Sequence, residues 1–241
     1  MNRLDNRAPN QLRPIRFTPN FTDYAEGSVL IEAGKTRVLC NVSVLDEVPP
    51  WREASGKGWL TAEYAMLPRS THQRTSRRRG SESARSQEIQ RLIGRALRAA
   101  VNLDVLGPRT LVVDCDVIQA DGGTRTASIT GAYVAVAMAL QKLIHDGALS
   151  EAALITPVAA VSVGVVQDEL LLDLCYEEDS AAEVDLNVVM TGTGKFVEIQ
   201  GTAEGKPFGQ TTLMNLIDLA REGIEQLLAE QVGLLSHAYK P

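Results

Sequence analysis

The chain has 241 residues, 44% of them hydrophobic, and a formal net charge of −6. That length and apolar content support a sizeable hydrophobic core. The N-terminal residues 1–15 are polar and contain no apolar run, so we expect no signal peptide. The most apolar window, residues 132–140, has about half the length of a membrane-spanning helix, so we expect no such span.

The cysteines, Cys40, Cys115 and Cys175, lie far apart, and each occupies an apolar, strand-like segment. We interpret them as buried, reduced thiols of a cytoplasmic protein, in preference to metal ligands or redox groups. The three histidines are scattered, and no Cys/His pair has the spacing of zinc ligands. The sequence therefore argues against a structural zinc site.

The first half of the chain contains several segments with strand-like alternation and one segment with a helical period. Polar, proline-containing sequence at residues 1–20 predicts an irregular arm, and Gly34-Lys35 separates two alternating segments as a hairpin turn does. Residues 68–83 are polar and arginine-rich, which predicts an exposed loop. The other predicted elements are strands at 28–33, 37–44, 59–67 and 110–118 and a helix at 86–101.

The second half predicts a buried helix, a run of strands and a final helix. Residues 126–143 are nearly all apolar or small, so this helix should be buried. We interpret the strands as a β-meander with turns at Gln167-Asp168 and at residues 192–194. No change of composition marks a linker, so we predict one α+β domain over residues 1–241, with mixed sheets covered by helices. The predicted elements are strands at 158–166, 169–176, 183–190 and 196–201 and a helix at 211–232.

Half of the chain's arginines fall between Arg69 and Arg98, in a segment with no lysine and only two acids. Arginine binds phosphate through a planar, bidentate contact. Such a local positive charge on an acidic protein therefore predicts a polyanionic ligand on one face. Within the predicted helix, Arg91, Arg95 and Arg98 follow one line, away from the apolar stripe.

A possible small-anion site lies at the string Gly122-Gly123-Thr124-Arg125, between a predicted strand and a predicted helix. Glycines allow a tight turn, and the start of a helix offers unpaired N–H groups and a positive dipole end. The threonine hydroxyl and the guanidinium add donors. The alternative is an ordinary glycine turn with a surface arginine. Arg85 precedes another predicted helix, where a bound anion would offset its charge, and its alternative is a solvated arginine.

The acidic segment 177–185 could hold a hard divalent cation. We place Asp179 at the end of one strand and Asp185 near the start of the next, so that a hairpin brings the two carboxylates together. Alternation along the second strand puts Asp185 on the face opposite its apolar residues. The alternative is a solvated acidic turn.

The candidate residues above lie in long strings that occur in the same order in one known family. On these strings the chain resembles the bacterial ribonuclease PH family, phosphate-dependent 3′-to-5′ exoribonucleases that trim transfer RNA precursors. The resemblance spans nearly the whole chain. The matching strings are Gly58 to Tyr64, Met66 to Thr71, Glu88 to Arg98, Gln119 to Ala127, Glu178 to Glu183 with Asp185, and Gln200 to Gly205.

The resemblance implies a role for each candidate. Arg85 and residues 123–125 match the family's phosphate site, and Asp179 and Asp185 match its paired acidic positions, which bind magnesium and support catalysis. The segment around residue 80 matches less well than its surroundings. The family's fold is a β-α-β sandwich of the ribosomal S5 domain-2 type.

The arginine-rich loop, with Arg69, Arg74 and Arg77, is similar to the family's transfer-RNA-binding surface, and we add the helix arginines Arg91, Arg95 and Arg98 to it. Family members assemble as a homohexamer, a trimer of dimers. The resemblance thus implies RNA, and neither DNA nor a membrane, as the partner.

The implied reaction is phosphorolysis, in which inorganic phosphate attacks the terminal phosphodiester and a nucleoside 5′-diphosphate leaves. The nucleophile is already an anion, so the site must hold two anions together and stabilise charge, with Mg²⁺ as the implied cofactor. One alternative is a non-catalytic RNA-binding ring subunit. The other is a hydrolytic, metal-dependent nuclease, which needs no phosphate pocket.

Overall fold

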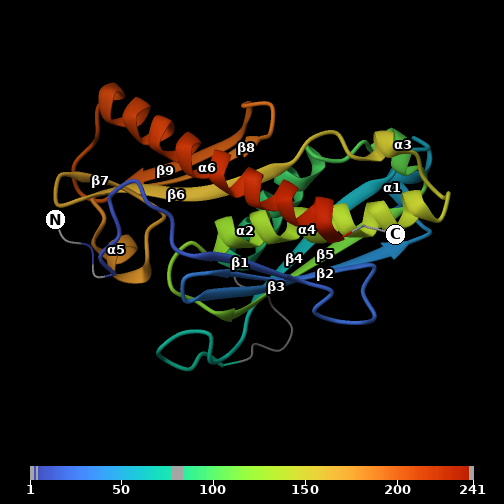
Figure 1. Cartoon of the computed structure of the whole chain (residues 1–241), viewed down its shortest axis with the longest axis horizontal. Coiled ribbons are helices and arrows are strands. Elements are labelled where there is room, and N and C mark those ends of the chain that lie inside the picture. The colour runs from blue at the N-terminus through green and yellow to red at the C-terminus, as the bar shows by residue number, and fades with distance from the viewer. Residues whose placement is uncertain (1–2, 4, 77–83, 239–241) are drawn as a thin grey trace.

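The structure is a computed structural model that describes residue 3, residues 5–76 and residues 84–238. Two β-sheets enclose helices α2 (Ala84–Arg98) and α4 (Thr124–His145), and helix α6 (Gln210–Ala238) covers the outer face of the second sheet (Figure 1). The predicted α+β class with mixed sheets covered by helices is confirmed. Short helical turns in the connections are α1 (Pro50–Glu53), α3 (Leu103–Leu106) and η1 (Glu151–Ala153).

The first sheet has the strand order β1-β2-β3-β5-β4. Neighbours are antiparallel except β4 and β5, which run parallel because α2 and α3 make the crossover between them. The predicted hairpin at Gly34-Lys35 is confirmed. The predicted irregular arm is wrong in part, because β1 adds an edge strand to β2. The strands are β1 (Ile15–Pro19), β2 (Gly27–Ala33), β3 (Thr36–Leu45), β4 (Trp59–Met66) and β5 (Thr110–Gln119).

Helix α4 lies between the sheets and is buried over most of its length, as predicted. Small residues let it approach the first sheet closely, since a Cβ on Gly131 would lie 2.6 Å from a side-chain carbon of Ile31. By length and composition this helix would suit a membrane, contrary to our expectation, yet 78% of its most apolar window is buried inside the protein. Its hydrophobicity is therefore explained by the two sheets that cover it.

The second sheet has the order β7-β6-β8-β9, with all neighbours antiparallel. The predicted meander is wrong, because β6 lies between β7 and β8. The predicted strand 169–176 is also too long: β7 ends at Leu172, and helix α5 (Tyr176–Ala181) follows. The strands are β6 (Val158–Val166), β7 (Glu169–Leu172), β8 (Val184–Thr191) and β9 (Phe196–Ala203).

Two large apolar clusters fill the layers. One surrounds α4 and includes residues of both sheets, and the other joins the second sheet to α6. Alternation along β8 places Val184, Leu186 and Val188 in the second cluster, as predicted. The prediction of buried, reduced cysteines is also confirmed, since Cys40, Cys115 and Cys175 are free and buried.

Candidate active site

The glycine string forms a tight turn between β5 and α4. Gly122 and Gly123 have φ values of 71° and 61°, a left-handed conformation that favours glycine. The helix begins at Thr124, two residues earlier than predicted, with Gly123 as an N-cap that makes no side-chain hydrogen bond. The first helical turn therefore presents unpaired N–H groups, together with the side chains of Thr124 and Arg125, to an anion.

The hydroxyl of Thr124 is held in place by a tyrosine. Thr124 is buried, and the hydroxyl of Tyr64 on β4 donates a hydrogen bond to its Oγ1 at 2.9 Å. Burial raises the pKa of Tyr64, although the hydrogen bond with Thr124 and the charges of Arg85 and Arg125 act against that rise. Tyr64 thus stays a donor at neutral pH, and the Thr124 hydroxyl keeps its own proton for a ligand.

Arg125 lies within a small polar group drawn from three elements. Its Nη1 donates to Gln200 Oε1 on β9 at 2.7 Å and lies 3.5 Å from Glu88 Oε1 on α2. Gln200 also donates to Glu88, at 2.7 Å. Gln200 and Glu88 orient the guanidinium, yet our sequence reasoning gave them no role. Both belong to the matching strings, which is the only sequence signal that could have singled them out.

Arg85 is exposed at the second position of α2, and its charge acts on the carboxylates of Asp179 and Asp185 as the charge of Arg125 does. Burial raises the pKa values of both acids, and the charges of the two arginines oppose that rise. The structure therefore brings together residues from three separate elements: the start of α2, the start of α4, and the segment from α5 into β8. Two cations and two carboxylates meet at this place.

The acidic pair is arranged differently from our prediction. Asp179 lies on α5 and Asp185 on β8, so the interpretation as a hairpin between two strands is wrong. The cause is that the chain leaves the sheet after β7 and forms a helical turn, which lets β8 pair with β6 instead. The two carboxylates nevertheless interact, because the charge of Asp179 helps to raise the pKa of Asp185.

Asp185 is the more perturbed acid. Burial first, and the charge of Asp179 second, raise its pKa from 3.8 to about 6, against the opposing charges of Arg125 and Arg85. Its Oδ1 is buried and makes no hydrogen bond. Asp179 is exposed at the surface, and partial desolvation raises the pKa of its carboxyl against the charges of Arg85 and Arg125. A buried oxygen without a partner, beside a second carboxylate, suits a divalent cation.

Some arginines of the arginine-rich segment are exposed, and others make contacts with the rest of the protein. Arg69, Arg74 and Arg91 are exposed, whereas Arg77 lies outside the described residues. Arg95 pairs with Glu198 at 2.6 Å. Arg98 is half-buried: it donates to the carbonyl of Leu60 at 3.0 Å, and its guanidinium lies 4.6 Å from the centre of a Trp59 ring.

A helix start built for an anion, set beside two carboxylates on a two-sheet α+β fold, defines an enzyme that acts on phosphate groups. The family comparisons agree. The model "3′ exoribonuclease family, domain 1" matches residues 11–141, and "domain 2" of the same family matches residues 156–223. The first match contains the first sheet, and the second contains β6 to β9. The chain belongs to the 3′ exoribonuclease family.

Close relatives carry the name ribonuclease PH. The Bacillus velezensis protein is 56% identical over 236 residues, which cover 97% of this chain and 96% of the relative. The Dehalococcoides mccartyi protein is 57% identical over 236 residues, with 97% and 98% covered.

Solved structures share the fold at lower identity. An Archaeoglobus fulgidus exosome with RNA bound to the active site matches with a TM-score of 0.80 at 22% identity, covering 95% of this chain and 92% of that one. Rice Rrp46 matches with a TM-score of 0.77 at 20% identity, covering 98% and 99%. The ribonuclease PH-type fold is therefore confirmed.

Proposed function

We propose that this chain is a phosphate-dependent 3′-to-5′ exoribonuclease, a tRNA nucleotidyltransferase that trims transfer RNA precursors and releases nucleoside 5′-diphosphates. One observation supports it above the others: the charges of Arg85 and Arg125 act on the same pair of carboxylates, Asp179 and Asp185. Phosphorolysis needs an anion site next to a cation site, and these four residues are suited to form the two.

Inorganic phosphate would bind at the start of α4. The hydroxyl of Thr124 and the N–H groups of the first turn donate to it, and Arg125 and Arg85 supply positive charge. Because phosphate is already an anion, the site works by holding the nucleophile near the scissile phosphodiester and by stabilising the charge that develops. Glu88 and Gln200 keep Arg125 pointed at that place.

Asp179 and Asp185 would hold Mg²⁺. Within the described parts of the chain there is no cluster of three or more His, Cys, Asp or Glu side chains that could hold a metal ion. Magnesium is often bound by one or two carboxylates together with substrate phosphates, so the pair fits. When bound, the ion would neutralise charge on the scissile phosphate and the leaving oxygen.

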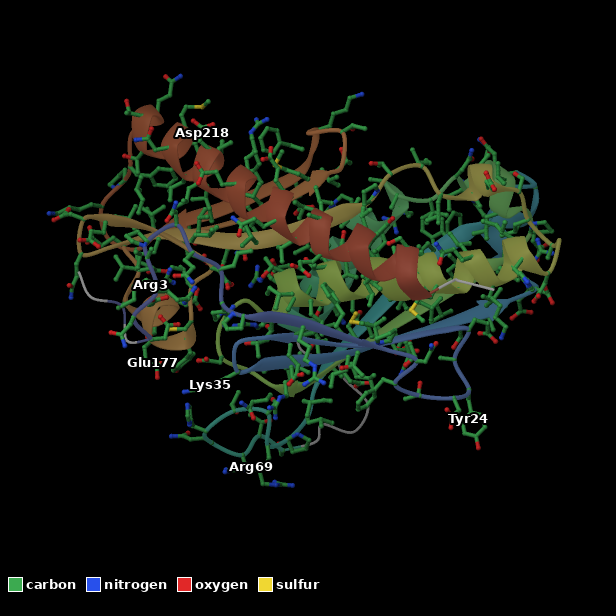
Figure 2. All side chains as sticks on the ribbon, in the orientation of Figure 1. Arg3, Tyr24, Lys35, Arg69, Glu177 and Asp218 are labelled. Carbon is green, nitrogen blue, oxygen red and sulfur yellow. The ribbon has the colours of Figure 1, made fainter. Side chains whose placement is uncertain are left out.

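The RNA surface we propose is the exposed, arginine-rich face. Its charge would hold the phosphates of transfer RNA precursors and of other RNA 3′ ends, those of ribosomal RNA included, with no preference for DNA. Figure 2 places Arg69 on a loop that projects from the protein near the first sheet. The exposed arginines assigned to this surface are Arg69, Arg74 and Arg91, together with Arg77, which lies outside the described residues. Of the other two arginines in the sequence assignment, Arg95 is paired with Glu198 and Arg98 is half-buried against Trp59.

We also propose a homohexamer, a trimer of dimers, in the cytoplasm, with each chain folding as one domain. Exposed aromatic side chains favour assembly: Tyr24 is 99% exposed and Trp51 64% exposed, and burial against another copy would remove this apolar surface from water. The reduced cysteines suit the cytoplasm. One cluster of apolar residues shared by both sheets supports a single folding unit.

The test is to incubate the purified protein with a 3′-extended transfer RNA precursor and Mg²⁺, with and without inorganic phosphate. We expect shortening of the RNA only with phosphate, and nucleoside 5′-diphosphates as products. A hydrolytic nuclease would release monophosphates without phosphate. A non-catalytic ring subunit would bind the RNA and leave its length unchanged. Either result would overturn the proposed function.

A further inference from the structure

Three arginines of the N-terminal arm are buried although they belong to a polar segment. Arg3, Arg7 and Arg13 are 2%, 8% and 3% exposed. The mechanism described above does not use them. Buried arginines need ionised partners, and all three pair with one or both of two equally buried acids, Asp173 and Glu178, while Arg7 pairs most closely with the more exposed Asp5. Asp173 lies in the connection from β7 to α5, and Glu178 lies in α5, the helix that carries Asp179.

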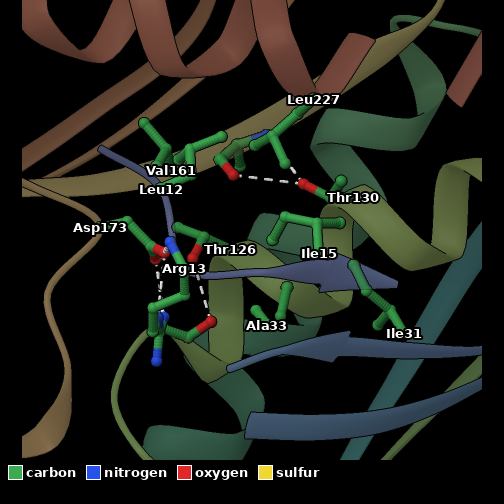
Figure 3. A pocket seen from close by; sticks show the side chains of 13 residues that line it. Leu12, Arg13, Ile15, Ile31, Ala33, Thr126, Thr130, Val161, Asp173 and Leu227 are labelled. Carbon is green, nitrogen blue, oxygen red and sulfur yellow. Dashed lines mark hydrogen bonds and ion pairs between the residues drawn. The ribbon is translucent and has the colours of Figure 1, made fainter. Parts of the chain in front are cut away.

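Arg13 joins that connection to the turn at residues 121–123, which precedes α4 and which we call the phosphate turn. Its Nε donates to Asp173 Oδ2 at 3.0 Å and its Nη2 to Oδ1 at 2.6 Å (Figure 3). Its Nη1 donates to the carbonyl of Asp121. Burial opposes the charge on both partners, but their attraction raises the pKa of Arg13 and lowers that of Asp173, so the pair is ionised. The planar guanidinium of arginine is needed here, because its separate N–H groups reach the Asp173 carboxylate and the Asp121 carbonyl at the same time.

The start of α5 is fixed by the same arm. Arg3 makes two hydrogen bonds of 2.7 Å to Glu178, and Arg3 and Arg7 both donate to the carbonyl of Asp173 at 3.1 Å. Glu178 in turn accepts a hydrogen bond from the backbone N–H of Cys175 at 3.0 Å, which caps the helix. Figure 2 places Arg3 at the same end of the molecule as Glu177 of α5.

The phosphate turn is held from two further sides. Thr36 Oγ1 donates to the carbonyl of Gly122 at 2.7 Å and accepts from the N–H of Asp121 at 2.9 Å. On the other side, a Cβ on Gly122 would lie 2.5 Å from the carbonyl oxygen of Leu174, so the turn packs directly on the backbone that leads into α5. The turn and α5 are therefore in contact, and Arg13 bridges them.

The arm does not form a second ligand site. The cavity beside Arg13 and Asp173 has a volume of about 20 Å³ and is otherwise lined mostly by apolar side chains such as Leu12 and Ile15 (Figure 3). That volume holds about one water molecule. The donors of Arg13 are directed at Asp173 and Asp121 rather than into this cavity.

We propose that Arg13 is a positioning residue that locks the Asp121–Gly123 turn against the start of α5 and so sets the phosphate site relative to Asp179. Thr36 assists by holding the same turn. The inference rests on the proposed function, because it assigns Arg13 to the placement of bound phosphate. Phosphate affinity should therefore depend on Arg13, whereas RNA affinity should not.

The test compares phosphorolysis kinetics of four variants. Arg13→Lys keeps the charge but loses the fork, and Arg13→Met with Asp173→Asn removes the pair without leaving a buried charge. Thr36→Val is nearly isosteric and removes only the hydrogen bonds to the turn. The control is Arg16→Met, three residues further along on β1, whose side chain is 76% exposed and lies 4.0 Å from Glu32.

We expect kcat/KM for phosphate to fall roughly a hundredfold in the double variant, mainly through KM, since a displacement near 1 Å has an effect of about that size. Arg13→Lys and Thr36→Val should raise the same KM by smaller factors, and Arg16→Met should not change it. Affinity for transfer RNA, measured separately, should be unchanged in all four. General loss of folded protein would lower kcat and leave the KM for phosphate at its original value.

A folded double variant with the original KM for phosphate would overturn the inference, and so would a loss confined to kcat. If both Arg13 variants fail to fold, Thr36→Val decides: a raised KM for phosphate supports the inference and an unchanged one overturns it. A parent protein that trims RNA without phosphate would overturn the proposed function and this inference together. A phosphate-dependent parent with unaffected variants would overturn this inference alone.

Discussion

Arginines occupy two regions of this protein in opposite ways. In the N-terminal arm, Arg3, Arg7 and Arg13 are scattered in sequence, almost fully buried and paired with acids, chiefly the buried Asp173 and Glu178. In the segment from Arg69 to Arg98 they are dense in sequence, and several are exposed. The dense run of arginines in the sequence therefore coincides with exposed charge, whereas the scattered arginines are buried in ion pairs. The buried arginines near the site are few, and only their ion-pair partners in the folded structure identify them.

If this division is correct, changes near the carboxylates should reduce the rate of reaction, and changes on the arginine surface should reduce salt-dependent RNA affinity. The predictions below test that division.

The largest effect is expected for Asp185→Asn. Asparagine has nearly the same shape but lacks the charge that would hold Mg²⁺, so phosphorolysis should fall at least about a thousandfold, as expected for the loss of several kcal/mol of transition-state stabilisation. RNA binding measured by filter retention should be unchanged. A variant with normal turnover and unaltered Mg²⁺ dependence would return Asp185 to the role of an acidic surface residue.

Arg125→Ala should reduce phosphorolysis roughly a hundredfold, because a charged contact in the transition state is worth on the order of 3 kcal/mol. RNA affinity should survive, since other arginines hold the RNA. A matched control is Arg37→Ala, whose side chain is 47% exposed and pairs with Glu32 on the first sheet. Near-normal turnover of the Arg125 variant at saturating RNA and phosphate would remove Arg125 from the site.

Activity at low Mg²⁺ should fall about tenfold between pH 7 and pH 5, because Asp185 has a pKa of about 6 and its protonated form cannot hold a cation. Raising the Mg²⁺ concentration should offset the loss, since metal and proton compete. A rate at pH 5 that does not respond to added Mg²⁺ would contradict this assignment.

The same raised pKa predicts a stability effect of defined sign. The folded state binds the proton of Asp185 more tightly than the unfolded chain does. Protonation of Asp185 therefore stabilises the fold, fully below about pH 4, and this stabilisation is lost as pH rises through about 6. At pH 7 without Mg²⁺, Asp185→Asn should therefore be more stable than the parent by on the order of 3 kcal/mol and should unfold at a higher temperature. That gain should disappear near pH 4 in thermal denaturation.

Replacing Arg69, Arg74 and Arg77 together by Ala should flatten the salt dependence of transfer RNA binding. Each lost phosphate contact lowers the log-log slope by roughly one or less, because fewer counterions are released. Cleavage of a very short RNA end should suffer less. Light scattering must first show an unchanged oligomer. Original affinity and slope in an intact oligomer would mean that this loop is not the RNA surface.

The smallest effect separates two arginines of α2. Arg98 contacts the Leu60 carbonyl and the ring of Trp59, so Arg98→Ala should cost about 1 kcal/mol of stability. Arg91 is exposed, so Arg91→Ala should leave stability unchanged and weaken RNA binding slightly. The opposite pattern, by denaturant titration and RNA binding, would show that Arg98 faces the RNA and Arg91 supports the fold.

The strand and helix periods, the buried helix after the glycine string and the family could all be predicted from the sequence, because these depend on local alternation, turn residues and long strings. Prediction from the sequence failed for the acidic segment. A strand pattern through residue 176 hid the exit of the chain after Leu172 and the helical turn of α5 that carries Asp179. Local pattern carries no information on which strands pair, so a meander was predicted where β6 lies between β7 and β8.

Contacts between side chains that are distant in the sequence depend on the tertiary fold. Glu88, Arg125 and Gln200 are separated by at least 37 positions, and Arg13 and Asp173 by 160, so no spacing rule connects them. Packing of α4 between two sheets brings these segments together, and the exclusion of water then makes each buried charge depend on its partner. Residue types could be read from the sequence, but their pairing and the raised pKa of Asp185 arise from the fold.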